Sequence, residues 1–105
     1  MKSRKKYTIL PSPIHGNGVF TTTFIEKDEV IDTGIYYSLY FFPVITPEFG
    51  SMINHSYKPS AYLSYNTRDS IYEVRAKNKL GNRVEITIDY NDTPWFIRKP
   101  EAHYT

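Results

Sequence analysis

The chain has 105 residues, no cysteine and a formal net charge of +2, which predicts one domain and excludes disulfides, thiolate zinc clusters and a cysteine nucleophile. Hydrophobic residues make up 40% and aromatic residues 16% of the sequence, so the chain is expected to fold rather than stay disordered. The charge is too small to indicate nucleic-acid binding, and the basic cluster within residues 1–6 is interpreted as a solvated arm.

Most of the chain is typical of short strands joined by turns. In chain order, the runs that predict strands are KYTIL (6–10), GVFTTTFI (18–25), EVIDTGIYYSLYFF (29–42), AYLSYN (61–66), SIYEVRAK (70–77) and VEITIDY (84–90). We expect the third run to break near Gly34, and Pro43 and Pro47 to interrupt the chain after it. The segments that predict turns are PSPIHGNG (11–18), EKDE (26–29), NTRD (66–69) and KLGNR (79–83). The sequence shows one helical signal, a turn near residues 47–53, so the predicted fold class is mostly β.

The sequence contains no recognisable signal for export or for membrane insertion. The apolar run after the basic cluster, residues 7–10, is too short for the core of a signal peptide, and no stretch reaches about 18 apolar residues. We therefore expect an intracellular, soluble protein without a membrane partner. Asn54 and Asn91 match the pattern Asn-x-Ser/Thr, but glycosylation is not expected without a secretory route.

Two polar stretches each leave a structural and a functional interpretation open. In HGNGVF (15–20), the two glycines could make a bend or let the backbone approach a ligand. A dinucleotide fingerprint would need a third glycine and a following helix. In INHS (53–56), the side chains could bond their own backbone in a turn, or the Asn54 amide could offer a donor and an acceptor to a base edge.

A third stretch, EITIDY (85–90), alternates with the period of a strand. The alternation places Ile86, Ile88 and Tyr90 on one face, so Tyr90 could be a tyrosine at the edge of the core or the polar end of a site. No metal is expected, because the histidines lie too far apart in the sequence to form a ligand set. These histidines are His15, His55 and His103.

In this order, the three stretches resemble the SET-domain family of protein lysine methyltransferases. HGNGVFTTTFIEKDEVIDTG (15–34) is similar to the family's opening Gly-x-Gly motif, SMINHSYKPSA (51–61) to its Asn-His-Ser-x-x-Pro-Asn signature and EITIDYND (85–92) to its Glu-Leu-Thr-x-Asp-Tyr signature. The resemblance runs from about residue 7 to residue 96, and it is strongest to the small, cysteine-free, stand-alone SET proteins of viruses. It implies a location in the cytoplasm or in the nucleus of a host cell.

The resemblance implies a SET-domain fold of the β-clip type, with several short curved sheets, little helix and a C-terminal pseudoknot. The single domain would fill residues 1–105. In that fold the chain after the third motif threads beside the Asn-His strand, which would bring Asn54 and His55 close to Tyr90. The basic arm, residues 1–6, and the tail, residues 97–105, are expected to be flexible.

The resemblance also implies S-adenosylmethionine as the cofactor and a lysine side chain of a protein or peptide, such as a histone, as the methyl acceptor. The implied cofactor-binding residues are His15, Gly16, Asn17, Gly18, Asn54, His55, Trp95 and Phe96. The implied substrate channel consists of Tyr36, Tyr37, Ile88 and Tyr90. Tyr90 is the implied catalytic residue, which orients the amine and the methyl through its hydroxyl. Ile88 has no hydroxyl to hold a blocking water, so transfer of two or three methyl groups is expected.

The chain departs from the family's pattern at several positions. Ser60 replaces the second Asn, Asp28 replaces a common glycine, and Gly81 comes two residues early in its turn. Residues 35–53 replace a longer insertion that carries a channel-wall helix. Either this short segment forms a minimal wall, or a second chain supplies it, and its apolar excess makes a homodimer an expectation.

Two classes of function remain open. The first is an active S-adenosylmethionine-dependent protein-lysine N-methyltransferase, with no nucleic acid as partner. The second is a non-catalytic SET-like β module that binds a protein partner, or the cofactor, without turnover. The glycine loop, Asn54 and Tyr90 favour the first class, whereas the short wall and Ser60 favour the second.

Overall fold

The computed structural model describes residues 5–39 and 42–94. Several expectations lie outside the described residues: those for most of the basic arm, for Trp95 and Phe96, and for the tail that would form the pseudoknot.

Eight strands and two single-turn 3-10 helices make up the regular structure of the described residues. They are β1 (Tyr7–Pro11), β2 (Asn17–Thr21), β3 (Val30–Ser38), β4 (Phe42–Ile45), η1 (Gly50–Met52), β5 (Asn54–His55), β6 (Ala61–Asn66), β7 (Ile71–Ala76), β8 (Glu85–Ile88) and η2 (Tyr90–Asp92). The predicted mostly β class is confirmed. The turn between β6 and β7 and the helical turn at η1 also lie where the sequence predicts them.

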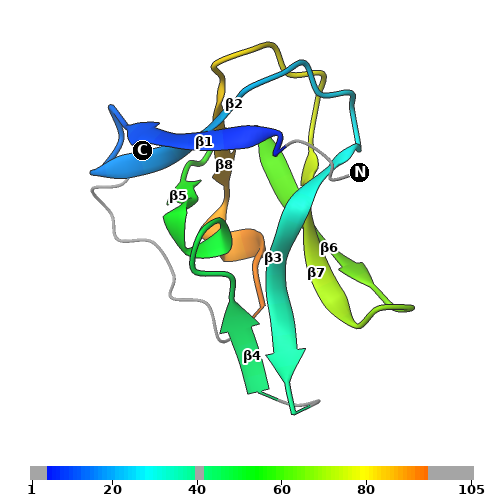
Figure 1. The fold of residues 1–105 in the computed structure, drawn as a ribbon. Coiled ribbons are helices and arrows are strands. Elements are labelled where there is room, and N and C mark those ends of the chain that lie inside the picture. The colour runs from blue at the N-terminus through cyan, green and yellow to red at the C-terminus, as the bar shows by residue number, and fades with distance from the viewer. Residues whose placement is uncertain (1–4, 40–41, 95–105) are drawn as a thin grey trace.

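The strands form two four-stranded sheets, in the orders β1-β2-β8-β5 and β4-β3-β7-β6. All pairings are antiparallel except that of β5 with β8, which is parallel and pairs Asn54 with Thr87 and His55 with Ile88. Figure 1 shows β5 and β8 side by side in the middle of the molecule, with β3 and the β6–β7 hairpin beside them. Strand β8, the last of the described strands, therefore joins the N-terminal hairpin to the Asn-His strand.

The predicted break near Gly34 is wrong, because β3 continues through this residue. The structure instead has a register shift against β7 between Thr33 and Ile35. A Cβ atom at Gly34 would lie 3.0 Å from Val74 Cγ2 and 3.2 Å from Leu63 Cδ2. The glycine therefore allows β3 to pass close to the β6–β7 hairpin without ending the strand.

One core is shared by both sheets. Residues from β2, β7 and β8 meet there with residues from the connections, and the side chains that are fully buried exclude water from the centre of the molecule. The largest of them are Phe49, Ile25, Ile35, Ile53, Ile86, Val19 and Val74. The segment that leads into β5 is therefore anchored in the core at two points, Phe49 and Ile53.

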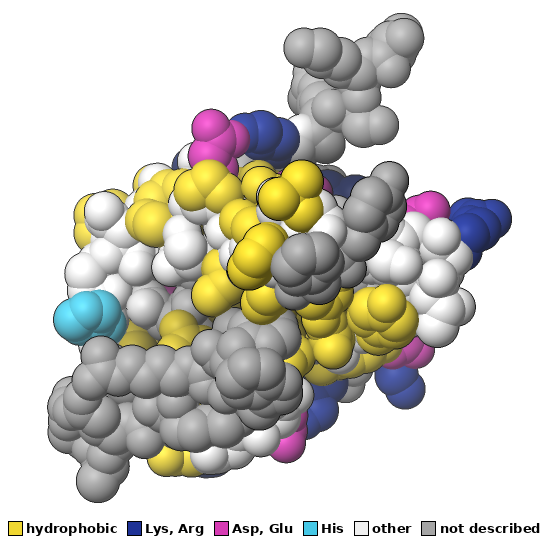
Figure 2. All heavy atoms as spheres, turned by 90° about the horizontal axis from the view of Figure 1, so that it is seen from below, with side chains coloured by type: hydrophobic (Ala, Val, Ile, Leu, Met, Phe, Trp, Pro, Cys, Tyr) yellow, Lys and Arg dark blue, Asp and Glu magenta, His cyan; other side chains and the backbone are white. Residues whose placement is uncertain are grey.

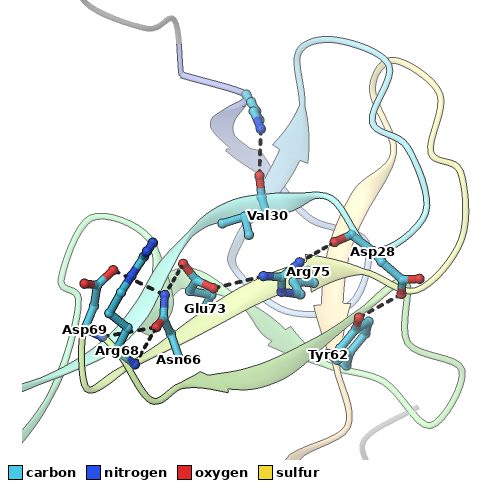
Figure 3. Close-up of polar contacts among 9 residues, drawn as sticks. Asp28, Val30, Tyr62, Asn66, Arg68, Asp69, Glu73 and Arg75 are labelled. Carbon is cyan, nitrogen blue, oxygen red and sulfur yellow. Dashed lines mark hydrogen bonds and ion pairs between the residues drawn. The ribbon is translucent and has the colours of Figure 1, made fainter.

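Polar contacts on the outer face of the β6–β7 hairpin hold the turn at residues 26–29 (Figure 3). Tyr62 Oη donates to Asp28 Oδ1 at 2.8 Å, and Arg75 Nη1 donates to the Asp28 carbonyl at 2.7 Å. Asp28 has a φ of +65°, in the left-handed region that aspartate tolerates better than most residues. The departure from glycine at this position is thus compatible with the backbone and adds one anchor, the hydrogen bond from Tyr62.

The turn that contains Gly81 also places a residue with a side chain in the left-handed region. Arg83 has a φ of +62° and an exposed side chain. Arg83→Gly should therefore stabilise the protein by about 0.5–1 kcal/mol, since relief of the Cβ penalty exceeds the entropy that glycine adds to the unfolded chain. Urea unfolding would measure this gain. Arg83→Ala is the control because it keeps the Cβ atom, and an equal gain in that variant would contradict a backbone origin.

Tyr7 of β1 packs its ring against Phe49 at a centroid distance of 4.5 Å and donates its hydroxyl to Asp32 Oδ2 at 3.1 Å. Burial of the side chain, followed by the hydrogen bond and charge of Asp32, raises the pKa of Tyr7 to about 12. The neutral tyrosine is therefore favoured by the folded state over the unfolded state, in which the pKa is about 10.

A pH dependence follows from this raised pKa. The stabilisation is present in full below pH 10 and is lost as the pH rises from about 10 to about 12, because the unfolded chain gives up the proton first. After allowance for solvent screening at the hydroxyl, we expect a loss on the order of 1 kcal/mol in the free energy of unfolding. Denaturant titrations of the wild type and Tyr7→Phe at several pH values would measure it. Parallel profiles for the two proteins would contradict the prediction.

The end of the β3–β4 hairpin is an apolar surface. Figure 2 shows hydrophobic side chains gathered across the middle of this face, with charged side chains toward its edge. Exposed hydrophobic residues of this hairpin are Tyr36, Leu39, Phe42 and Ile45. A surface of this kind gains from burial, and homodimerisation stays a prediction that sedimentation equilibrium would test.

Candidate functional site

The parallel pairing of β5 with β8 brings the second and third sequence motifs together. Tyr90 N donates to His55 Nδ1 at 3.0 Å, and Ser56 N donates to the Ile88 carbonyl at 3.0 Å. The rings of His55 and Tyr90 lie 5.1 Å apart. The expectation that these residues meet across 35 positions of sequence is confirmed by the hydrogen bond between them.

His55 is a buried anchor of this junction. Because Nδ1 accepts a hydrogen bond from a backbone N–H, the neutral ring carries its proton on Nε2. Asp89 Oδ1 lies 3.7 Å from the same Nδ1, which is too far for a hydrogen bond. Tyr57 packs edge-on against the ring at a centroid distance of 4.4 Å. The imidazole therefore fixes the backbone from which Tyr90 projects.

The hydroxyl of Tyr90 is held by the residue that precedes the Asn-His strand. Tyr90 Oη donates to the Ile53 carbonyl at 2.6 Å. A hydroxyl that already donates its proton can act only as an acceptor toward a further ligand. The half-buried Tyr90 thus presents an oriented oxygen at the point where η2 and β5 meet.

An apolar cavity of about 220 Å³ opens beside Tyr90. Its lining consists of Gly34, Ile35, Ile45, Gly50, Ser51, Ile53, Leu63, Val74, Ile88 and Tyr90. None of these side chains is charged, and the segment 35–53 supplies five of the ten residues. The short segment between the first two motifs therefore builds its own wall of the cavity.

Gly50 has a steric role in that wall. A Cβ atom at this position would overlap the Gly34 carbonyl and lie 2.9 Å from Thr46 Oγ1. Thr46 Oγ1 accepts from Gly50 N at 2.8 Å and donates to the Thr33 carbonyl at 2.9 Å. This threonine therefore fastens η1 to β3 at the edge of the cavity.

The four predicted channel residues do not all line this cavity. Ile88 and Tyr90 do, whereas Tyr36 and Tyr37 do not. Ile35 points inward, so alternation along β3 directs Tyr36 to the outside, where it is 41% exposed. Tyr37 lies farther along the strand, where its hydroxyl interacts with Tyr72 and contributes to the raised pKa of that tyrosine, after the larger effect of burial.

The glycine loop lies against Asn54. Asn54 Nδ2 donates to the carbonyls of His15 and Asn17, both at 3.1 Å, and to Glu85 Oε2 at 3.0 Å. A Cβ atom at Gly18 would overlap the Glu85 carboxylate and lie 3.1 Å from Asn54 Nδ2. The predicted residues 15–18 and Asn54 are thus brought together.

The orientation of the Asn54 amide follows from these contacts. Its nitrogen faces three acceptors that belong to the protein, so the side-chain oxygen is the atom of the amide that is turned away from the loop and from Glu85. Gly16 has a φ of +46°, and a Cβ atom there would meet nothing within 4 Å. Glycine at position 16 therefore allows the left-handed backbone of the turn. Glycine at position 18 allows the side chains of Glu85 and Asn54 to lie close to the backbone of the loop.

Three polar residues of this region were not among the site residues predicted from the sequence. Ser12 Oγ lies 2.9 Å from both oxygens of the Glu85 carboxylate. Ser60 Oγ donates to the Glu85 carbonyl at 2.8 Å and accepts from Thr87 N at 3.0 Å, which fastens the loop before β6 to β8. Glu85 is the first residue of the third motif, and this position was the one feature of the sequence that could have indicated a role for it. The replacement of asparagine by Ser60 is thus accommodated by the backbone of β8.

Metal and membrane features were searched for in the same residues. Among residues 5–39 and 42–94, no group of three His, Cys, Asp or Glu side chains could hold a metal ion. No helix within those ranges is long and apolar enough to cross a membrane.

Comparisons with known proteins identify the fold. No family model matches the sequence, and no curated protein does. The structure is similar to the crystal structure of a Plasmodium falciparum protein described as a candidate histone methyltransferase, with a TM-score of 0.69 and 24% sequence identity. The match covers 89% of this chain and 99% of the other. The predicted fold class is confirmed by this likeness, whereas the resemblance to viral members of the family stays a prediction.

Proposed function

We propose that the protein is an S-adenosylmethionine-dependent protein-lysine N-methyltransferase. The observation that carries the proposal is the position of Tyr90, whose hydroxyl is fixed on the Ile53 carbonyl beside an uncharged cavity. Asn54, which follows Ile53 in the chain, donates hydrogen bonds to the glycine loop. A methyl donor on the loop and an amine in the cavity would therefore meet near one oriented oxygen. The fold shared with the Plasmodium protein supports this assignment.

The residues at the loop fit the cofactor. S-adenosylmethionine, when bound, supplies a methyl group on a sulfonium cation. Gly18 lacks the side chain that would displace the Glu85 carboxylate and Asn54 from the loop. Asn54 turns its side-chain oxygen, an acceptor for the ammonium group of the cofactor's methionine part, away from the loop. Trp95 and Phe96, which we also propose for the adenine side, lie outside the described residues.

The cavity can prepare a lysine for attack. At pH 7 an ordinary lysine must lose a proton at a cost of roughly 4–5 kcal/mol. The apolar lining, with Ile35, Ile53 and Ile88 in it, disfavours the charged ammonium and so lowers the pKa of an entering amine. Tyr90 Oη, as an acceptor, can then orient the amine for in-line displacement.

Ile88 bears on the number of methyl groups transferred. It is buried, lines the cavity and lies two residues before Tyr90. Because its side chain has no hydroxyl, we expect di- or trimethylated product, and Ile88→Tyr should shift the products toward monomethyllysine. Mass spectrometry of peptide products would measure this distribution, with Ile88→Phe as the control without a hydroxyl. Monomethyllysine alone from the wild type would contradict the prediction.

A labelled-methyl assay tests the function. The protein is incubated with S-adenosylmethionine carrying a labelled methyl, and with histones, host-cell protein and lysine peptides as acceptors. We expect label in lysine side chains. Cofactor binding without transfer to any acceptor would instead support the alternative, a non-catalytic SET-like module.

A further inference from the structure

The Glu85 carboxylate is fixed against the glycine loop by uncharged donors. Asn54 Nδ2 donates to Oε2 at 3.0 Å, and Ser12 Oγ lies 2.9 Å from both carboxylate oxygens. The place that a side chain of Gly18 would occupy is filled by the same carboxylate. The negative charge therefore lies against the backbone of residue 18.

The charge of Glu85 is not neutralised within the part of the chain that the structure describes. The ion pairs of lysine and arginine found there are Lys5–Glu48, Lys6–Glu29 and Arg75–Glu73. A hydroxyl and an amide orient a carboxylate but do not cancel its charge. Because Glu85 is half-buried, its field acts on a nearby cation with less screening than that of an exposed carboxylate.

Ser12 connects this carboxylate to the conformation of the loop. Its hydroxyl accepts from Ile14 N at 3.0 Å, and its backbone N–H donates to the Gly16 carbonyl at 2.8 Å. Ser12 thus closes the turn that precedes Gly18 and ties it to β8. The loop is held at one end by Ser12 and at the other by Asn54, and both contacts meet at Glu85.

We propose that Glu85 is a positioning residue of the methyl-donor site, whose charge favours the cationic donor over its neutral thioether product. The inference rests on the proposed function, because it needs S-adenosylmethionine on the glycine loop. Loss of the methyl group removes the positive charge from the sulfur, so the attraction to Glu85 ends with the transfer. Because of Glu85, the protein should therefore bind the donor more tightly than the product.

Calorimetric titration of the full chain with S-adenosylmethionine and S-adenosylhomocysteine tests the proposal. The two ligands share every group except the sulfonium methyl, so the ratio of their dissociation constants isolates the sulfonium charge. Glu85→Gln should weaken binding of the donor about tenfold more than binding of the product. Ser12→Ala, which keeps the charge, should weaken both ligands by similar factors and speed amide exchange in residues 14–18. The exposed carboxylate at Glu48 provides the control, and Glu48→Gln should change neither constant.

The outcomes are distinct. An unchanged ratio in Glu85→Gln, with equal weakening of both ligands or with none, would overturn the proposed charge effect. Failure of the wild type to bind either ligand would refute the proposed function itself. Urea unfolding shows whether each variant is folded. Both ligands are titrated into the same preparation, so the ratio of their dissociation constants does not depend on the fraction of active protein.

Discussion

Replacement of Tyr90 by phenylalanine is expected to lower methyl transfer by roughly 100- to 1000-fold while leaving cofactor affinity nearly unchanged. The hydroxyl that is removed donates to the Ile53 carbonyl at 2.6 Å, and Tyr90 lines the apolar cavity. Without it, an amine in the cavity has no fixed acceptor to align its lone pair with the methyl group. The ring would keep its packing against His55, so the backbone of the site should survive.

Two measurements separate catalysis from structure in this variant. Turnover is measured with the labelled methyl donor, and cofactor affinity by calorimetry on the same preparation. The free energy of unfolding should fall by about 1 kcal/mol for the lost hydrogen bond. Tyr57→Phe is the matched control, because Tyr57 also contacts the His55 ring but does not line the cavity. Parallel losses of turnover and cofactor binding in Tyr90→Phe would contradict an orienting role.

Gly18→Ala should abolish measurable cofactor binding, with a loss of about 100-fold or more in affinity. The added Cβ atom would overlap the Glu85 carboxylate. A glutamate side chain can move, but here movement breaks its contacts with Ser12 and Asn54, and with them the anchor of the loop. Loss of these hydrogen bonds should also lower the free energy of unfolding by about 1–2 kcal/mol.

Gly81→Ala is the control for this substitution. A Cβ atom at Gly81 would come no closer than 3.8 Å to its nearest neighbour, Phe24, so affinity and stability should stay near those of the wild type. Calorimetry and urea unfolding give both quantities for both variants. Wild-type affinity in Gly18→Ala would show that the loop does not bind the cofactor.

The sequence predicts most of the strands and the three motifs of the site, but not how the strands that carry these motifs pair with one another. The alternation in residues 61–66 and 71–76 is enough to predict a hairpin, since its partners are close in the chain. Nothing in the periodicity indicates that β5, two residues long, pairs parallel with β8. The family resemblance implied only that Asn54 and His55 lie close to Tyr90, and a strand so short carries no measurable pattern from which its pairing could be predicted.

One predicted channel residue lies away from the cavity for a physical reason. The family resemblance implied Tyr36 for the channel, but the inward position on β3 belongs to Ile35, and alternation sends Tyr36 outward. Glu85 and Ser12 lie 73 residues apart in the chain, so their contact depends on the tertiary fold and could not be inferred from either residue.

The position of β8 between β2 and β5 has a consequence for biosynthesis. During translation, the N-terminal hairpin and the Asn-His strand leave the ribosome long before the strand that joins them. Until β8 has emerged, the glycine loop lacks Glu85 and the cavity lacks Ile88 and Tyr90. The proposed site therefore forms late, in a step governed by distant contacts, which are slow to close. A nascent chain that stalls before residue 85 would expose two unpaired strand edges and would have no activity.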